Sequence, residues 1–563
     1  MGWHSRGQVP QPASVPVLLL EKAESYGDRD YLHFWRDGHQ QELTWREFAE
    51  KARRVAVALV EAGFKPGETV ALLSENRVEW LLADLGVQAA GCVTVPIYPS
   101  NPPEIVAHIV KDSQARLVIA GSEKLAAKVP EATRLVQMDS EFQDWLRAAP
   151  SEPALAELQR RLAGISEEEV ATVVYTSGTT GDPKGVTLLH ANFLWAARAG
   201  LRHFTLGADD VFLSYLPYSH VLERVDGIFV PSVAGCRIWL SRGMERLADD
   251  IQEVHPTVML GVPRVFEKIY ETVNDRLQRE PGWRRRVAGW ALAQGSSGWR
   301  AALADRLLRR SLNERLTGGR LRFFISGGAP LNSAVERFFW SLGVKILQGW
   351  GMTETTSGVT SNTETRHRYG TVGVALPEVE LRIADDGEIL VRGAALMAGY
   401  RNRPEATAAT IREEGWLHTG DIGEIDGDGF LRITDRKKDL IKTSGGKYIA
   451  PQPIEAALQS HRIVKSALVI ADERPYAIAL IVPDLAALGA SGPDDSRVRP
   501  ELQRVVEEVN RGLGSWETLK RFAVLPRDFE EAKGELTPTL KAKRRVIAEH
   551  FKDEIEATYS APR

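Results

Sequence analysis

The sequence has 563 residues, which is enough for roughly three to five domains of ordinary size. Hydrophobic residues make up 43% and charged residues 26%, as in soluble globular proteins, which excludes a mainly disordered chain. The 71 lysines and arginines nearly balance the 75 aspartates and glutamates, and the net charge of −4 excludes the basic field of a dedicated nucleic-acid-binding protein. Two cysteines, Cys92 and Cys236, are too few for a disulfide scaffold and favour a cytoplasmic setting. No apolar run reaches about 18 residues, so we expect no transmembrane helix.

Helical patterning covers 12–26 and 44–63, with Thr44 as the predicted N-cap of the second helix. Short apolar runs that predict strands lie at 69–75, 92–98, 117–121, 170–176, 211–216, 257–261 and 321–326. Their alternation with helical stretches predicts parallel β-α-β layers. Beyond about residue 375 the pattern changes to short strands with hairpin-type turns, and residues 440–563 mix strands and helices.

These patterns predict an α/β fold class with two domains. The large N-terminal domain, residues 1–435, would contain layered α/β subdomains and a β-rich subdomain. Residues 436–563 would form a small, mobile α+β C-terminal domain.

A glycine- and threonine-rich string, YTSGTTGDPKGV at 175–186, follows one of the predicted strands. Glycines permit a close backbone approach, while hydroxyls and backbone N–H groups can surround phosphate oxygens. The spacing differs from that of the Walker P-loop, which disfavours a standard P-loop NTPase. The candidate phosphate-binding residues are Thr176, Ser177, Gly178, Thr179, Thr180, Gly181 and Lys184.

This string resembles the signature loop of the adenylate-forming superfamily, which includes acyl-CoA synthetases, firefly luciferase and nonribosomal-peptide adenylation domains. Six further strings follow in the order of that family: LPYSHVLER (216–224), ISGGAPL (325–331), QGWGMTETT (348–356), WLHTGDIGEID (416–426), DRKKDLIKTSGGKYI (435–449) and TPTLKAKRR (537–545). Seven motifs in order identify the chain as a member of the superfamily.

The resemblance implies a reaction in two steps. A carboxylate attacks the α-phosphate of ATP, which gives acyl-AMP and pyrophosphate, and a thiol then captures the acyl group. Lys541 would be the catalytic cation, although Leu540 stands where the family usually has glycine and leaves Lys543 as the alternative register. Thr353 would contact the α-phosphate, and Glu354 would be the Mg²⁺ ligand. His220 lies in the segment that would meet the carboxylate and the acyl chain.

The same resemblance assigns the remaining site residues. The predicted ATP- and AMP-binding positions outside the phosphate loop are Gly327, Gly328, Ala329, Trp350, Gly351, Asp421, Arg436 and Lys442. Among them Asp421 would accept the ribose hydroxyls, with Arg436 as its partner, and Lys442 would contact the adenylate phosphate. Lys438 matches the family's hinge, and Ser444, Gly445 and Gly446 would line the passage for the pantetheine arm of CoA.

Several strings, among them LPYSHVLER and TPTLKAKRR, resemble long-chain fatty acyl-CoA synthetases. We therefore predict a long-chain fatty acid–CoA ligase that uses ATP, CoA and Mg²⁺. The enzymatic alternatives are a fatty acyl-AMP ligase serving a carrier protein and a medium-chain or aryl CoA ligase. A non-catalytic nucleotide-binding paralogue is disfavoured, because all the expected catalytic positions are occupied.

An arginine-rich segment suggests a membrane surface as a further partner. Residues 283–322 contain ten arginines against Asp305 and Glu314, and Trp283, Val287 and Trp290 recur at helical spacing. Such a helix either rests on anionic lipid at the inner face of the membrane or is an ordinary solvated face. The acyl chain length and the choice between monomer and homodimer stay open.

Overall fold

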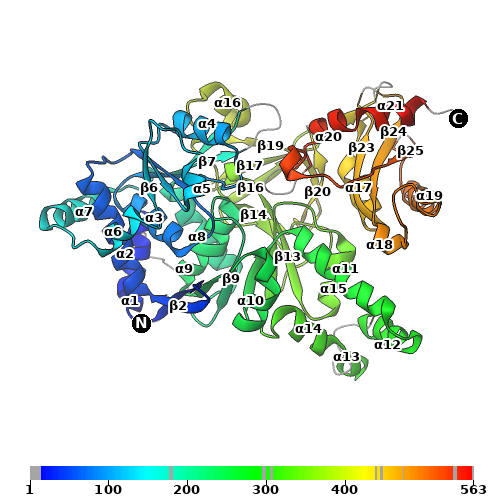
Figure 1. Ribbon diagram of the computed structural model, residues 1–563, viewed down its shortest axis with the longest axis horizontal. Coiled ribbons are helices and arrows are strands. Elements are labelled where there is room, and N and C mark those ends of the chain that lie inside the picture. Colours follow the sequence, from blue (N-terminus) through cyan, green and yellow to red (C-terminus); the bar gives the residue numbers. More distant parts are fainter. Residues whose placement is uncertain are drawn as a thin grey trace. The chain divides into compact units, whose positions relative to one another are not determined.

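A computed structural model describes residues 14–176, 182–293, 299–304, 308–437, 440–443, 448–472, 474–515, 517–536 and 542–560. The chain divides into two compact units (Figure 1). The smaller unit comprises Asn332–Ala334, Arg382–Leu390 and His418–Arg563, and the rest of the chain forms the larger unit.

The first large sheet has nine strands among the described residues. Its order is β15 (Val374–Ala375), β14 (Gly358–Ser361), β13 (Lys345–Gly351), β12 (Phe323–Ser326), β11 (Val258–Gly261), β9 (Val211–Ser214), β10 (Arg237–Leu240), β1 (Asp30–Arg36) and β2 (His39–Thr44). The strands from β13 to β1 pair in parallel. The antiparallel pairs β13–β14, β14–β15 and β1–β2 complete the two edges.

The second large sheet is seven-stranded within the described ranges. Its order is β18 (Gly399–Tyr400), β8 (Lys184–Leu189), β7 (Val170–Thr176), β4 (Val93–Ile97), β3 (Thr69–Leu73), β5 (Leu117–Ala120) and β6 (Arg134–Gln137). The strands from β7 to β6 are parallel, and β8 and β18 join in antiparallel pairs. The predicted parallel layers are confirmed.

Helices connect these strands. Up to residue 417 they are α1 (Val15–Tyr26), α2 (Trp45–Glu61), α3 (Val78–Ala89), α4 (Pro103–Ser113), α5 (Glu123–Ala126), α6 (Glu141–Arg147), α7 (Glu152–Gly164), α8 (His190–His203), η1 (Leu222–Phe229), α9 (Val230–Ala234), η2 (Met244–Arg246), α10 (Leu247–Val254), α11 (Pro263–Arg279), α12 (Gly282–Ala293), α13 (Trp299–Ala304), α14 (Arg310–Thr317), α15 (Ser333–Ser341), η4 (Thr353–Thr355), α16 (Pro404–Thr410) and η5 (Glu413–Gly415). As predicted, Thr44 caps α2, because its hydroxyl accepts from the Glu47 backbone N–H and the Glu47 carboxylate accepts from the Thr44 N–H.

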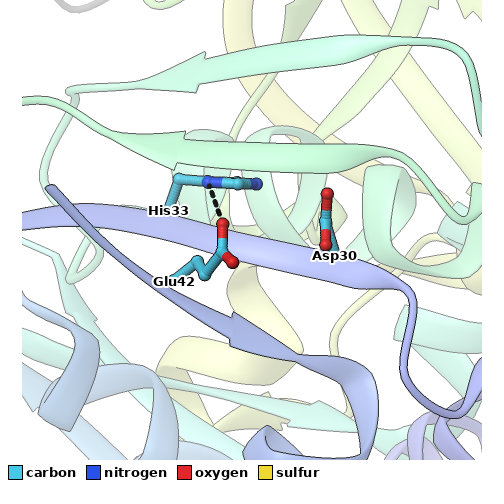
Figure 2. Close-up of side chains that lie close together, drawn as sticks. All are labelled: Asp30, His33 and Glu42. Atoms are coloured by element: carbon cyan, nitrogen blue, oxygen red, sulfur yellow. Dashed lines mark ion pairs between the residues drawn. The ribbon is translucent and has the colours of Figure 1, made fainter.

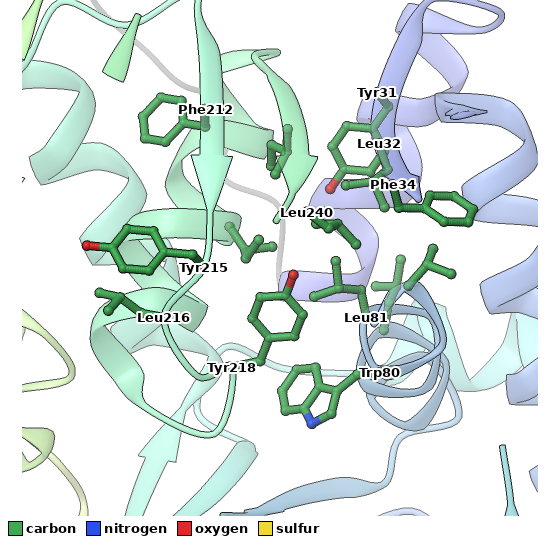
Figure 3. Packing of buried hydrophobic residues seen from close by; sticks show 14 of the residues in the cluster. Tyr31, Leu32, Phe34, Trp80, Leu81, Phe212, Tyr215, Leu216, Tyr218 and Leu240 are labelled. Atoms are coloured by element: carbon green, nitrogen blue, oxygen red, sulfur yellow. The ribbon is translucent and has the colours of Figure 1, made fainter. Parts of the chain in front are cut away.

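One hydrophobic core joins the strands of the nine-stranded sheet to one face of the seven-stranded sheet. In β3 the side chains alternate: Val70 and Leu72 belong to this core, whereas Ala71 and Leu73 belong to the cluster on the opposite face. Helix α3 contributes Trp80, whose ring packs against Tyr218, four residues beyond the end of β9 (Figure 3). Burial on both faces explains why β3 reads as a continuous apolar run.

The smaller unit is built around a three-stranded sheet, β23 (Val464–Ile470), β24 (Ala477–Pro483) and β25 (Leu519–Val524). Helices α17 (Pro451–Gln459) and α19 (Val498–Asn510) cover one face, and α20 (Arg544–His550) and α21 (Lys552–Ser560) cover the other. The short helices α18 (Leu485–Leu488) and η6 (Glu531–Lys533) lie in its connections. This arrangement is the α+β organisation predicted for the C-terminal portion.

Two smaller sheets complete the described residues. The four-stranded sheet has the order β16 (Val379–Ile383), β17 (Glu388–Gly393), β19 (Leu417–Ile425) and β20 (Leu431–Arg436). The strands β21 (Ile441–Lys442) and β22 (Tyr448–Ile449) form an antiparallel pair. The predicted β-rich portion is therefore present, whereas the domain boundary at 435/436 stays a prediction.

The hairpin β1–β2 was not predicted from the sequence. Its turn is Asp37–Gly38, and both residues have positive φ, 52° and 78°. An Asp-Gly pair between strands is a strong hairpin signal, because that turn requires positive φ at both positions. The second strand, HQQELT, lacks the apolar pattern that predicts a strand, because β2 is an edge strand with mostly exposed side chains.

Candidate active site

Three of the predicted motifs begin at one edge of the nine-stranded sheet. LPYSHVLER follows β9, GGAPL follows β12, and MTETT follows β13. These strands run parallel, so their carboxyl ends lie at the same edge, where ligands bind in open α/β sheets. The fold therefore brings these three motifs to one sheet edge, although they are far apart in the sequence.

Helix α3 and Asn76, which precedes it, hold the segment that carries His220. The Asn76 side chain donates to the Leu216 carbonyl at 2.6 Å and accepts from the Tyr218 N–H at 3.0 Å. Arg224 is buried and binds Asp84 of α3 through two hydrogen bonds, Nε to Oδ2 at 2.8 Å and Nη2 to Oδ1 at 2.6 Å. Two parallel N–H···O bonds fix the orientation of both groups.

His220 itself is half-buried at the start of η1. Its Nδ1 accepts from the Leu222 N–H at 3.1 Å. The Leu222 side chain lies beside Gly327, whose added Cβ would be 3.4 Å from Leu222 Cδ1. The structure therefore brings the predicted acyl segment next to the predicted adenine loop.

Two carboxyl groups lie on η1, where Glu223 is buried and Asp226 is half-buried. Glu223 accepts from the Ser214 hydroxyl, and Asp226 accepts from the hydroxyl of Ser357, three residues after Glu354. Burial raises the pKa of Glu223 to about 8, with the Asp226 carboxyl adding to this shift. Burial likewise raises the pKa of Asp226 to about 6.

This burial predicts that the protein loses stability as the pH rises. The pKa of Glu223 in the folded state lies above the value of about 4.3 for an unfolded chain, so between these values the folded state holds more protons. The unfolding free energy should fall from about pH 5 to 8 by up to about 1.4 kcal/mol per pH unit for this one group. Glu223→Gln should flatten that decline in urea unfolding curves.

The matched control is Glu405→Gln, which removes an exposed carboxylate on α16. It should leave the pH profile of the wild type unchanged. An equally steep decline in Glu223→Gln would contradict a buried, proton-binding Glu223.

The predicted adenine-binding residues fall at the ends of β12 and β13. Gly327 is buried, whereas Gly328 and Ala329 are exposed, and Gly328 has φ +85°, where an L side chain would be strained. Trp350 is buried on β13 opposite Thr360 of β14. A Cβ on Gly351 would lie 1.8 Å from the Ser357 carbonyl oxygen, so the chain crossing requires glycine there.

The predicted magnesium ligand, Glu354, is buried in η4 and has a partner that the sequence analysis missed. The Tyr400 hydroxyl donates to Glu354 Oε1 at 2.7 Å, and Lys184 Nζ lies 5.0 Å from the centre of the Tyr400 ring. Burial and the Glu354 carboxylate raise the pKa of the Tyr400 phenol, which stays protonated as a donor. The structure therefore joins the phosphate-loop lysine and Glu354 through one aromatic ring.

Pairing between distant strands creates this contact. In β18, Tyr400 pairs with Val186 of β8, just beyond Lys184. Thr176 and Lys184 are cross-strand partners in β7 and β8 and therefore flank the phosphate loop. Five predicted loop residues lie outside the described residues: Ser177, Gly178, Thr179, Thr180 and Gly181. Thr353, next to Glu354, is half-buried.

In the smaller unit, Asp421 and Arg436 are direct cross-strand partners in β19 and β20. Arg436 Nε lies 3.1 Å from Asp421 Oδ1, and the Asp421 side chain is mostly buried. The two predicted ribose-binding residues therefore form an ion pair. Lys442 pairs with Tyr448 between β21 and β22.

The other predicted residues of this unit, Lys438, Ser444, Gly445, Gly446 and Lys541, lie outside the described residues. The residues on either side of 537–541 are bound to each other. Leu536 and Ala542 form a β-bridge, and the Lys543 N–H donates to the Glu535 carbonyl at 2.7 Å. Hydrogen bonds from Arg527, and further from His550, hold the pKa of the buried Glu535 carboxyl at about 2. Glu535 is therefore a charged anchor at the base of this segment.

Only part of the arginine-rich segment is exposed to solvent. Trp283 and Val287 on α12 are 62% and 40% exposed, and Arg284, Arg285 and Arg286 beside them are exposed. Arg309, by contrast, is buried and donates to the Ala291 carbonyl at 2.9 Å. The exposed patch is therefore confined to part of the predicted surface.

Among the helices that the structure describes, none combines the length and the apolar character needed to span a bilayer.

Comparisons with known proteins cover nearly the whole chain. The sequence profile of the AMP-binding enzyme family matches residues 19–401, and that of the AMP-binding enzyme C-terminal domain matches residues 438–563. The chain is 36% identical to long-chain-fatty-acid–CoA ligase FadD15 of Mycobacterium bovis, over 98% of this chain and 99% of that protein.

Two further comparisons agree. Long-chain-fatty-acid–CoA ligase ACSBG2 of Gallus gallus is 29% identical over 98% of this chain and 81% of its own length. The crystal structure of the anthranilate CoA ligase AuaEII in complex with anthranoyl-AMP superposes with a TM-score of 0.76 at 20% identity, covering 96% of this chain and 98% of that chain. The predicted superfamily and fold class are confirmed.

Proposed function

Because this chain belongs to the AMP-binding enzyme family, we propose that it is a long-chain fatty acid–CoA ligase. The fatty acid and ATP give acyl-AMP and pyrophosphate, and acyl-AMP and CoA then give acyl-CoA and AMP. The observation that carries this assignment is the match to FadD15 along almost the full length of both chains. The carrier-protein ligase and the medium-chain or aryl ligase are not favoured.

The first step needs positive charge and hydrogen-bond donors around the α-phosphate. Lys184 supplies a cation at the base of the phosphate loop, and Lys541 is proposed to neutralise the charge that develops during adenylation. Thr353 would donate its hydroxyl to the α-phosphate, and His220 would border the fatty acid carboxylate. The remaining loop hydroxyls would hold the β- and γ-phosphates.

Glu354 fits the Mg²⁺ that accompanies ATP. Its carboxylate offers hard oxygen ligands, and the Tyr400 hydroxyl binds one oxygen and fixes the orientation of the group. When bound, the ion would neutralise phosphate charge. Tyr400 would keep Glu354 in place while the nucleotide enters.

The nucleotide would be held by residues of four sequence motifs: ISGGAPL, QGWGMTETT, WLHTGDIGEID and DRKKDLIKTSGGKYI. Gly327, Gly328, Ala329, Trp350 and Gly351 are proposed to border the adenine, and Asp421 to accept the ribose hydroxyls. The ion pair with Arg436 supports this role, because it fixes the orientation of the Asp421 carboxylate. Lys442 would contact the phosphate of the adenylate.

The second step requires access for CoA. We propose that residues 436–563 turn about Lys438 after adenylation and that Ser444, Gly445 and Gly446 border the pantetheine arm. Residues 1–435 would carry the ATP and acyl sites throughout. These roles rest on the motif resemblance of DRKKDLIKTSGGKYI.

The test is the release of AMP with and without CoA, across fatty acids from butyrate to icosanoate and with benzoate and cinnamate. We expect CoA-dependent AMP and thioester formation that is greatest with laurate or longer acids. Accumulation of acyl-AMP in the presence of CoA would instead indicate a carrier-protein ligase. No AMP from any long-chain acid would overturn the assignment.

We also propose that α12 contacts anionic lipid. Exposed Trp283 and Val287 beside Arg284, Arg285 and Arg286 combine apolar and cationic groups on one short helix. The wild type should co-sediment with phosphatidylglycerol vesicles at low salt, and Trp283→Ala/Val287→Ala should co-sediment several-fold less. Met244→Ala, which removes an exposed apolar side chain elsewhere, is the control. Equal binding by all three proteins would contradict a role for α12.

A further inference from the structure

The hairpin β1–β2 carries a buried imidazole, the side chain of His33. His33 is 5% exposed, and neither Nδ1 nor Nε2 forms a hydrogen bond within the described part of the chain. The ring stacks on Trp239 of β10 with a centroid distance of 4.5 Å and an interplanar angle of 8°. Burial of unsatisfied polar atoms costs free energy, so a ligand at this ring would offset a cost that the fold already bears.

Two carboxylates lie beside this imidazole. Glu42 of β2 is the cross-strand partner of His33, and its Oε2 lies 3.6 Å from Nδ1, which is too long for a hydrogen bond. The strand pairing shifts register between Asp30 and Leu32. Without this irregularity Asp30, three positions before His33, would point to the opposite face of the sheet.

The three side chains therefore converge on one face of the hairpin (Figure 2). One ligand atom from each of Asp30, His33 and Glu42 lies within 4.8 Å of the other two. His33 is held by its burial and by the parallel pairing of β1 with β10, whereas Asp30 and Glu42 are exposed. A fixed imidazole with two adjustable carboxylates is a partly preorganised set of donors.

We propose that Asp30, His33 and Glu42 form a binding site for a divalent transition-metal ion, with Zn²⁺ as the leading candidate. Zn²⁺ takes imidazole nitrogen and carboxylate oxygen at about 2.0–2.2 Å, so the ligand atoms would move to about 3–4 Å from one another. Both carboxylates are exposed, so their side chains have room to rotate toward the ion. Mg²⁺ prefers oxygen ligands alone and does not suit the imidazole.

The site lies at an edge of the nine-stranded sheet, where β2 is the last strand. An ion bound there would connect β1 to β2 and stabilise the hairpin, because a ligand that binds only the folded state raises its stability. The role is structural and needs neither ATP nor fatty acid. Its test is therefore independent of the enzymatic activity.

The experiment measures Zn²⁺ binding by equilibrium dialysis of tag-free, chelator-treated protein without nucleotide. The wild type should bind one Zn²⁺ more per chain than Asp30→Asn/Glu42→Gln, whose affinity at the site should fall at least about 10-fold, a loss typical even of groups that only support metal ligands. Both residues are exposed, so the variant should fold. Glu21→Gln/Glu50→Gln, with the same change in charge on exposed positions of α1 and α2, should bind as the wild type does.

A second measurement replaces Zn²⁺ by Co²⁺, whose visible absorption reports a site with nitrogen and oxygen ligands. The wild type and the control should show this absorption, together with a rise in Tm when Zn²⁺ is added, and Asp30→Asn/Glu42→Gln should show neither. Equal Zn²⁺ stoichiometry and equal Tm shifts in the wild type and in Asp30→Asn/Glu42→Gln would overturn the proposal.

Discussion

Lys541→Ala should lose about 10²–10³-fold in the rate of adenylation and still convert supplied acyl-AMP and CoA to the thioester. The ammonium group is proposed to act only where charge develops between the carboxylate and the α-phosphate, so its removal affects one half-reaction. Pyrophosphate exchange measures the first step, and thioester formation from synthetic acyl-AMP measures the second.

Lys543→Ala is the matched control, because it removes the other lysine of the same motif. Lys543 is exposed just before α20, and its backbone N–H is bound to Glu535 at the base of the segment. The control should adenylate normally. Normal adenylation by Lys541→Ala together with a defect in Lys543→Ala would show that the motif register is shifted by two residues.

Glu354→Gln should reduce adenylation by about 10²–10³-fold and raise the Mg²⁺ concentration needed for half-maximal rate. The substitution keeps the size of the side chain and its bond with Tyr400 while removing the negative charge. The buried position of Glu354 allows little compensation by solvent. Initial rates across an Mg²⁺ titration, at saturating ATP and fatty acid, measure both effects.

Tyr400→Phe tests how much the orientation of Glu354 matters when its charge is kept. It removes the 2.7 Å hydrogen bond and leaves the carboxylate, so we expect a loss of about 10-fold, as for one hydrogen bond to a charged group. An equal loss in Tyr400→Phe and Glu354→Gln would indicate that Tyr400 acts on the substrate directly. Wild-type activity in Glu354→Gln would contradict its role as the metal ligand.

The parts of the fold that could be predicted from sequence are those with strong local patterns. Buried strands such as β3 are continuous apolar runs, and α2 begins at a capping box that the sequence displays. The hairpin β1–β2 was missed because its outer strand is polar and lies at a sheet edge. Its Asp-Gly turn was the local signal that could have revealed it.

The candidate site likewise contains residues that could be predicted from the sequence and one, Tyr400, that could not. Motif resemblance predicted roles for Glu354 and Asp421, and the structure adds a partner for each: the Tyr400 phenol for Glu354 and the Arg436 guanidinium for Asp421. Tyr400 lies 46 residues beyond Glu354 in a two-residue strand. Only the pairing of β18 with β8 brings it to the site, and no local pattern encodes that pairing.

The acyl-adenylate mechanism is tested most directly by following one oxygen atom. Palmitate labelled with oxygen-18 in both carboxylate positions is incubated with the enzyme, ATP, Mg²⁺ and CoA, and the nucleotide product is analysed by mass spectrometry. Attack of the carboxylate on the α-phosphate places one of the two labelled oxygens in the bridge between the acyl carbon and phosphorus of acyl-AMP. Thiolysis breaks the bond between that oxygen and the acyl carbon, so the bridging oxygen leaves in AMP and the other stays in the thioester carbonyl. We therefore predict AMP carrying one oxygen-18 for each palmitoyl-CoA formed. Unlabelled AMP, or ADP in its place, would contradict an acyl-adenylate mechanism.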